Sequence, residues 1–113
     1  MVDNKVLADL MNKKGYIFKS AKIIDKKLLA TRKKVDIFMC VDTKKFYHIV
    51  FFTEQKSRFL LKNAQEVLML EEKIKLLSMH NNKYKHLFIK EGICSKAKHF
   101  LEHIGWRVYN DFM

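Results

Sequence analysis

An acid, a lysine and an arginine alternate directly after an apolar stretch in the middle of the chain. The stretch from Phe46 to Arg58 reads FYHIVFFTEQKSR, so Glu54, Lys56 and Arg58 stand two residues apart. Residues two apart on an extended strand point to the same face of a sheet. A carboxylate beside an ammonium offers a ligand for a divalent cation and a positive charge that steadies a phosphate. The pattern indicates phosphate chemistry at a strand end.

A second acid, Asp36, lies on the preceding apolar segment, residues 35–41. A tight turn over residues 42–45 predicts that Asp36 pairs with Phe51, three residues before Glu54. At about 3.3 Å per residue, this register separates the two acids by on the order of 10 Å along the strands. Whether the two carboxylates share one metal ion depends on this register.

Positive charge dominates the chain and is unevenly placed. The 113 residues include 23 Lys and Arg against 12 Asp and Glu, a net charge of +11. Residues 13–34 hold nine of the basic residues and a single acid, Asp25. A field of this sign favours a polyanionic partner, and nucleic acid above all. The residues that we expect to contact phosphates are Lys13, Lys14, Lys19, Lys22, Lys26, Lys27, Arg32, Lys33, Lys34, Arg58 and Lys62.

Several patterns argue against export and against a membrane partner. The first residues, MVDNKVLADLM, lack the basic start and apolar core of a signal peptide. No apolar run approaches the roughly 20 residues that are needed to span a bilayer. The two cysteines, Cys40 and Cys94, are far apart in sequence and are expected to be reduced thiols. We therefore expect a cytoplasmic protein without a membrane partner.

The chain length predicts one domain over residues 1–113. Apolar periodicity and turn residues predict, in chain order, a helix over 2–14, strands over 16–24, 35–41 and 46–56, a helix over 63–77, a strand over 85–90, a helix over 95–104 and a strand over 106–109. Asn63 with Glu66, and Ser95, are the expected N-terminal caps of the last two helices. The order α-β-β-β-α-β-α-β predicts an α/β fold with a mixed central sheet flanked by helices.

This element order and three short motifs resemble the PD-(D/E)XK, or restriction-endonuclease-like, superfamily, and most of all its small Holliday-junction-resolvase-like branch. The motifs are Leu10 to Tyr16 (LMNKKGY), Val35 to Ile37 (VDI) and Glu54 to Arg58 (EQKSR). In such proteins a helix ends in a glycine–aromatic pair, an acid opens the second strand, and an E-x-K-x-R-like string closes the third. The resemblance covers most of residues 2–77 and implies a restriction-endonuclease-like core.

The resemblance implies that Asp36 and Glu54 are catalytic carboxylates that bind Mg²⁺ or Mn²⁺. It implies that Lys56 orients the attacking water or stabilises negative charge at the phosphorus atom. Hard carboxylate oxygens suit these ions, and an ion between two carboxylates activates water and neutralises developing charge. The implied protein is a metal-dependent endodeoxyribonuclease that acts on DNA rather than RNA and forms a homodimer.

Two other functions remain open. The first is a non-catalytic DNA- or RNA-binding module on a degenerate nuclease scaffold, which would need no cofactor. The second is a protein-interaction subunit whose basic face meets an acidic partner. Tyr16, Phe18 and Tyr47 interleave with lysines, a pattern typical of platforms that stack on bases, although packing in the core is their expected role. His48 alternates with apolar neighbours and is expected at the edge of the core.

Overall fold

The computed structural model describes residues 4–24, 35–53, 58–78, 82–89 and 92–109. In chain order, its elements are α1 (Asn4–Lys13), β1 (Phe18–Ile23), β2 (Val35–Asp42), β3 (Tyr47–Thr53), α2 (Leu61–Ser78), β4 (Tyr84–Ile89), α3 (Ser95–His103) and β5 (Trp106–Tyr109). The predicted order of helices and strands is confirmed. None of the helices within these ranges is long and apolar enough to cross a bilayer.

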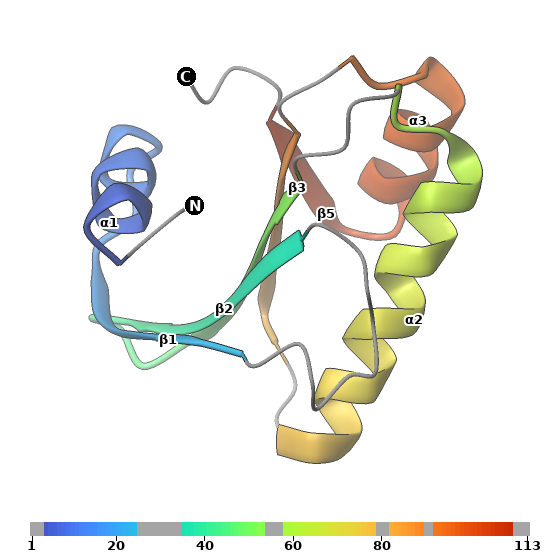
Figure 1. The fold of residues 1–113 in the computed structure, drawn as a ribbon. Coiled ribbons are helices and arrows are strands. Elements are labelled where there is room, and N and C mark those ends of the chain that lie inside the picture. The colour runs from blue at the N-terminus through green and yellow to red at the C-terminus, as the bar shows by residue number, and fades with distance from the viewer. Residues whose placement is uncertain (1–3, 25–34, 54–57, 79–81, 90–91, 110–113) are drawn as a thin grey trace.

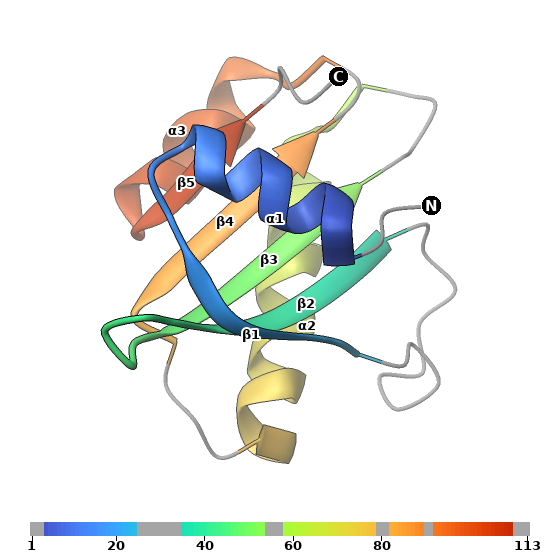
Figure 2. The ribbon, with the colours of Figure 1, turned by 90° about the vertical axis from the view of Figure 1, so that its left-hand side faces the viewer.

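The described strands form a sheet in the order β1-β2-β3-β4-β5. The pairs β1–β2 and β2–β3 are antiparallel, whereas β3–β4 and β4–β5 are parallel and are joined through α2 and α3. α2 and α3 lie on one side of this sheet and α1 lies on the other (Figures 1 and 2). The predicted α/β fold, with a mixed sheet flanked by helices, is therefore confirmed.

The central strands are buried on both faces because helices cover both sides of the sheet. Alternate residues of β2, β3 and β4 enter two separate hydrophobic clusters. The cluster on the side of α2 and α3 includes Ile37, Ile49, Phe51, Ala64, Val67, Ile74, Leu87, Leu101 and Trp106. The cluster on the side of α1 consists of Leu7, Met11, Phe38, Cys40, Val50, Phe52 and Phe88. We call the second side the α1 face.

The loop between β2 and β3 is organised by the carboxylate of Asp42. Its Oδ1 atom accepts hydrogen bonds from the backbone N–H groups of Lys44, at 2.8 Å, and Phe46, at 3.0 Å. The backbone N–H of Asp42 also donates to the carbonyl oxygen of Phe46 at 3.0 Å, so these two residues close the hairpin. Lys45 takes up the turn with a positive φ of 70°. The loop therefore has three residues, 43–45, rather than the predicted four.

This shorter loop shifts the strand register by one residue from the predicted one. Asp36 pairs with Phe52, and the predicted pairing with Phe51 is wrong. In sequence, Glu54 then follows the partner of Asp36 by two residues instead of three. The physical reason is the side chain of Asp42, which caps the turn from inside the hairpin and extends the ladder by one pair.

Both predicted helix caps are also displaced. α2 begins at Leu61, before Asn63, whose Oδ1 atom reaches back to accept the backbone N–H of Leu60 at 2.8 Å. Asn63 thus serves the start of the helix from its first turn instead of preceding it. Cys94, and not Ser95, caps α3, and its Sγ atom accepts the backbone N–H of Ala97 at 3.4 Å.

Candidate functional site

Asp36 lies on the α1 face of the sheet, half-buried, near the start of β2. Its partner Phe52 belongs to the cluster on that face, and directly opposed residues of an antiparallel pair share a face. The ring of Phe52 stacks on Phe88 with centroids 4.7 Å apart, and Phe88 stacks on Tyr109 at the same distance. A row of aromatic rings therefore crosses β3, β4 and β5, and it begins at the ladder partner of Asp36.

The other two predicted catalytic residues, Glu54 and Lys56, lie outside the described residues. Their roles, and the metal site that Glu54 would share with Asp36, stay predictions. Within the described ranges, no three His, Cys, Asp or Glu side chains gather as a metal site would require. What the structure adds is the corrected register, in which the β3 partner of Asp36 precedes Glu54 by two residues instead of three.

A chain of four polar side chains runs across the α1 face from β2 to β5. His48 Nε2 lies 2.8 Å from Asp42 Oδ2, and His48 Nδ1 lies 3.0 Å from His86 Nε2. The other nitrogen of His86, Nδ1, lies 3.2 Å from the hydroxyl of Tyr109. Both imidazoles are fully buried. His48 was expected only at the edge of the core, so the structure corrects that expectation.

The protonation states along this chain follow from the hydrogen bonds and from burial. The hydrogen bond from His48 lowers the pKa of Asp42 most strongly, and the backbone N–H groups of Phe46 and Lys44 lower it further. Burial, and then the neighbouring His48, lower the pKa of His86 to about 3. At neutral pH Asp42 is therefore a carboxylate and His86 a neutral imidazole. We assign the proton on His48 Nε2 from its bond to that carboxylate.

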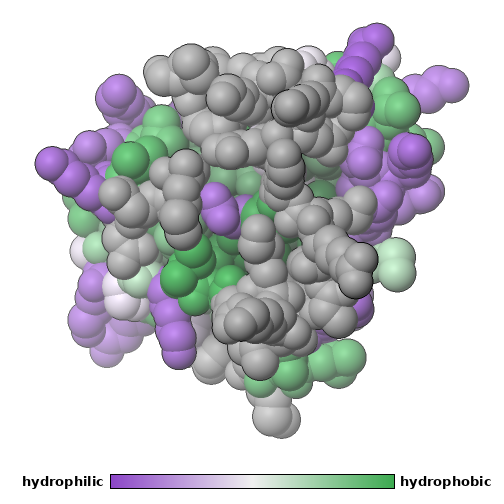
Figure 3. Space-filling view, viewed as in Figure 1, coloured by the Kyte–Doolittle hydropathy of each residue, from purple (hydrophilic) through white to green (hydrophobic). Residues whose placement is uncertain are grey.

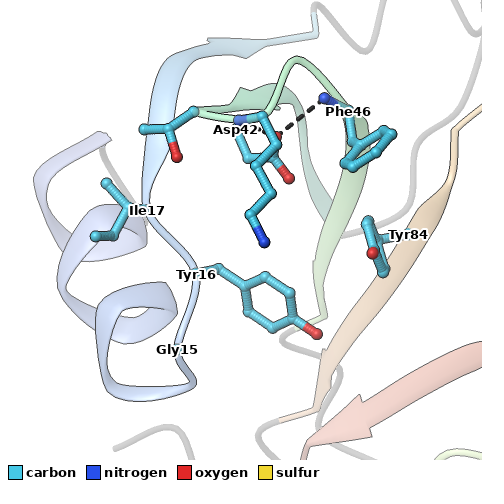
Figure 4. Close-up of a pocket in the computed structure, with 8 residues that line it drawn as sticks. Gly15, Tyr16, Ile17, Asp42, Phe46 and Tyr84 are labelled. Atoms are coloured by element: carbon cyan, nitrogen blue, oxygen red, sulfur yellow. Dashed lines mark hydrogen bonds between the residues drawn. The ribbon is translucent and has the colours of Figure 1, made fainter.

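A pocket of about 290 Å³ opens where the hairpin loop meets the end of α1 (Figure 4). Its lining residues are Gly15, Tyr16, Ile17, Asp42, Thr43, Lys44, Phe46 and Tyr84. We call it the hairpin pocket. Gly15 forms part of the pocket wall. It has a positive φ of 92° and ends α1, as the sequence predicted.

No family model matches the sequence, and no curated protein is significantly similar to it. Two solved structures are similar in fold. A repair endonuclease from Pyrococcus abyssi shares 17% identity at a TM-score of 0.53, over 97% of this chain and 47% of that one. EndoMS in its apo form shares 14% identity at a TM-score of 0.52, over 97% of this chain and 46% of that one. This chain has a nuclease-like fold. It spans about half the length of both structures, and at these identities the likeness concerns the fold alone.

On this nuclease-like fold, the basic residues occupy more than one surface. Lys13, Lys19 and Lys22 are exposed, on α1 and β1. Arg58 and Lys62 are exposed just before and within the start of α2, which lies on the other side of the sheet. Figure 3 shows hydrophilic side chains on both flanks of the molecule. The remaining predicted contacts, Lys26, Lys27, Arg32, Lys33 and Lys34, lie outside the described residues.

Among the predicted phosphate contacts that the structure describes, Lys14 differs from the others because it is half-buried. Its ammonium lies 4.8 Å from the centroid of the Tyr109 ring, within the range of a cation–π interaction. The end of α1 is therefore joined to the last strand of the sheet at the Tyr109 end of the polar chain.

Reasoning from the sequence missed the partners of His48 in this nuclease-like fold. Asp42 was expected only as a turn residue, while His86, Tyr84 and Tyr109 come from strands distant in sequence. The available signal was a histidine inside each of two strongly apolar strands, in HIVFF and KHLFI. Two buried histidines commonly need polar partners, but the sequence does not say which ones.

Proposed function

We propose that this chain binds DNA and hydrolyses its phosphodiester bonds with a divalent metal ion held by Asp36 and Glu54. The observation that carries the proposal is the position of Asp36 in a nuclease-like fold. It lies directly opposite Phe52 on β3, and the sequence Glu54-Gln55-Lys56 follows one residue after Thr53, where β3 ends.

The donor chemistry of these residues fits Mg²⁺ or Mn²⁺, because both side chains offer hard carboxylate oxygens. The half-buried position of Asp36 partly shields its carboxylate from bulk water. A bound ion would supply positive charge to the phosphate and lower the pKa of a water molecule. Asp36 and Glu54 would orient that water. Lys56 would stabilise the negative charge that develops on the phosphoryl oxygens.

The basic surfaces of the chain favour DNA as the substrate in this proposal. A net charge of +11 attracts a polyanion over long distances, and exposed lysines and arginines neutralise phosphates one by one. Lys13 lies on α1, on the same side of the sheet as Asp36, and Lys19 lies on the edge strand β1. Lys22 pairs with Met39, which packs against the cluster on the side of α2 and α3, so its side chain lies on the face opposite Asp36. We therefore assign Lys13 and Lys19, among the described residues, to hold DNA near the face that carries Asp36.

The decisive experiment is cleavage of labelled single-stranded, duplex and four-way-branched DNA with Mg²⁺, Mn²⁺ or EDTA. The variants are Asp36→Asn and Glu54→Gln, with Glu102→Gln as control because Glu102 is exposed on α3. We expect cleavage only with metal, lost in the first two variants and kept in the control. Titration of Mn²⁺ by calorimetry should show weaker binding in the same two variants. Metal-dependent cleavage that persists in both would overturn the assignment.

A second candidate is a non-catalytic nucleic-acid-binding module on the same fold. The hairpin pocket favours it, since this pocket includes Asp42, six residues along β2 from Asp36, or about 20 Å at 3.3 Å per residue. In this candidate function, binding would use the hairpin pocket, apart from the proposed site of chemistry. DNA that is bound but uncut, with an affinity indifferent to metal, would support this candidate and exclude hydrolysis.

A homodimer, implied by the resemblance to resolvases, belongs to the same proposal. Light scattering on the eluting protein tests it directly, because the chain mass is 13.5 kDa and a dimer has twice that mass. A particle of the single-chain mass at micromolar concentration, with and without DNA, would exclude the dimer without affecting the assignment of Asp36.

A further inference from the structure

We propose that the hairpin pocket binds one unpaired base of a single-stranded nucleic acid. The proposal rests on the proposed binding of nucleic acid by this chain and adds to it a preference for single strands. It concerns a different end of the sheet from Asp36, so the two sites can be tested separately.

The walls of the pocket are aromatic. Tyr16, Phe46 and Tyr84 are each half-buried and line the cavity, and Figure 4 shows the ring of Tyr16 across the opening from that of Tyr84. The rings of Tyr16 and Tyr84 contact each other at 58°, with centroids 6.0 Å apart, and those of Phe46 and Tyr84 meet edge to face at 6.3 Å, so the three rings form one continuous wall. A volume of about 290 Å³ lies at the lower end of the range for small-molecule sites, about 300–1,000 Å³. The space therefore suits one planar ring system rather than a larger ligand.

Cations surround these rings. The ammonium of Lys83 lies 3.6 Å from the centroid of Phe46, and Lys44 lines the pocket itself. The guanidinium of Arg107 lies 5.5 Å from the centroids of both Tyr16 and Tyr84 and donates a hydrogen bond to the Tyr16 hydroxyl. A base carries its phosphate with it, so aromatic walls with a positive rim match the two parts of a nucleotide.

The acid in the wall does not oppose this. Asp42 is the acidic residue among the described residues that line the pocket. Its Oδ1 atom accepts two backbone N–H groups and its Oδ2 atom contacts His48. Because both oxygens are engaged by donors within the protein, its negative charge is largely compensated before a phosphate approaches.

The polar chain behind the pocket keeps one wall fixed. Tyr84 stacks on the buried ring of His48 with centroids 4.6 Å apart, and His48 stacks on His86 at 5.2 Å and 7° between planes. Hydrogen bonds at both nitrogens hold His48 in place. A pre-ordered ring loses little freedom when a ligand stacks on it, and so less binding energy is lost to ordering.

The pocket distinguishes single-stranded from duplex nucleic acid, because a base inside a duplex is already stacked on a neighbouring base at each face. Only a base that is free of its stack can lay a face against this aromatic wall. Loss of one base–aromatic contact typically weakens single-strand binding roughly 10-fold. Loss of a contact to a phosphate, by contrast, weakens both single-strand and duplex binding and reduces the salt dependence.

The test is fluorescence anisotropy with a labelled single strand, its duplex, and an abasic strand of equal length. Phe46→Ala removes a wall, Lys44→Ala removes a cation at the rim, and Lys96→Ala on α3 is the control. We expect wild-type protein to prefer the single strand to the abasic strand about 10-fold or more. Phe46→Ala should lose that preference and keep its duplex affinity. Lys44→Ala should reduce the salt slope with either DNA, and Lys96→Ala should behave as wild type.

A second variant, Ile17→Asn, guards against misfolding, because Ile17 is 64% exposed at the pocket and tolerates a polar residue, and asparagine adds no charge. It should also weaken single-strand binding selectively. Wild-type binding that ignores the bases, or equal losses for single strand and duplex in Phe46→Ala and Ile17→Asn, would overturn the pocket and leave DNA binding intact. Absence of any wild-type binding near physiological salt would instead overturn the proposed function, and this proposal with it.

Discussion

His48 and His86 lie side by side inside the protein, with Nδ1 of the first 3.0 Å from Nε2 of the second and neither ring exposed to solvent. Only one of these two nitrogens carries a proton, because protons on both would point two N–H groups at each other. His48 Nε2 lies 2.8 Å from Asp42 Oδ2, so the carboxylate serves as the acceptor at one end of the pair. A charge on His86 would have no carboxylate partner in this chain of bonds.

This arrangement predicts acid sensitivity. The folded pKa of His86 is about 3, below the ordinary histidine value of 6.5, so the unfolded state binds more protons between these values. Stability should therefore fall as pH drops from about 6.5 towards 3, by at most ~1.4 kcal/mol per pH unit for one group. Urea unfolding at a series of pH values measures the slope. His86→Gln should flatten it, and the exposed His99→Gln should not; an unchanged slope in His86→Gln would contradict the assignment.

Asp42 should matter more than its place at a turn suggests. Its pKa is below 3.8, so its stabilising contribution is present above that pH and is lost as the pH falls further. Asp42→Asn keeps one acceptor oxygen for the loop but cannot accept the proton of His48 Nε2 through nitrogen. We expect a clearly lower melting temperature at pH 7 by circular dichroism. Asp9→Asn, at an exposed position of α1, should melt as wild type; equal melting of both variants would argue against the role.

The core on the side of α2 and α3 should depend on the contact between Phe51 and Trp106. Their rings meet edge to face with centroids 5.4 Å apart, and Phe51 is fully buried. Phe51→Ala should cost roughly 3–5 kcal/mol of unfolding free energy, as for other buried aromatic residues. Leu76→Ala, at a position 79% exposed on α2, should change stability by less than about 0.5 kcal/mol. A small loss in Phe51→Ala would mean that this packing is wrong.

Binding of nucleic acid should be strongly dependent on salt. Lys19 and Lys22 are exposed on β1, and if each neutralises one duplex phosphate, removing both should reduce the slope of log affinity against log salt by about 1.8. The matched control replaces Lys96 and Lys98, exposed on α3, with alanine. Equal slopes for the two double variants would show that β1 does not contact DNA.

The order of elements was predictable because apolar periodicity and glycines carry it. Gly15 ends α1, and the apolar runs that precede Asp42 and Glu54 form β2 and β3, the two strands of the central hairpin. The register was not predictable, since it depends on whether the carboxylate of Asp42 turns inward to cap the loop. That choice belongs to the folded hairpin and leaves no mark in the pattern of apolar residues.

The candidate site, too, could be predicted from the sequence only in part. Asp36 was identified from its place on an apolar strand, and the structure gives it a defined partner, Phe52. The hairpin pocket could not be predicted from the sequence, because Tyr16, Phe46 and Tyr84 approach one another only when three separate parts of the chain meet in the fold. The motif of Glu54 and Lys56 lies outside the described residues, and its role stays a prediction.

The location of Cys40 gives this protein a reporter of its own unfolding. Burial in the cluster on the α1 face raises the pKa of its thiol to about 12, so almost no reactive thiolate forms while the sheet is closed. Cys94, half-buried at the start of α3, is less protected. In a labelling experiment with an alkylating reagent, the rate of the second modification of each molecule would therefore report the opening of the sheet. No cysteine needs to be introduced for this measurement.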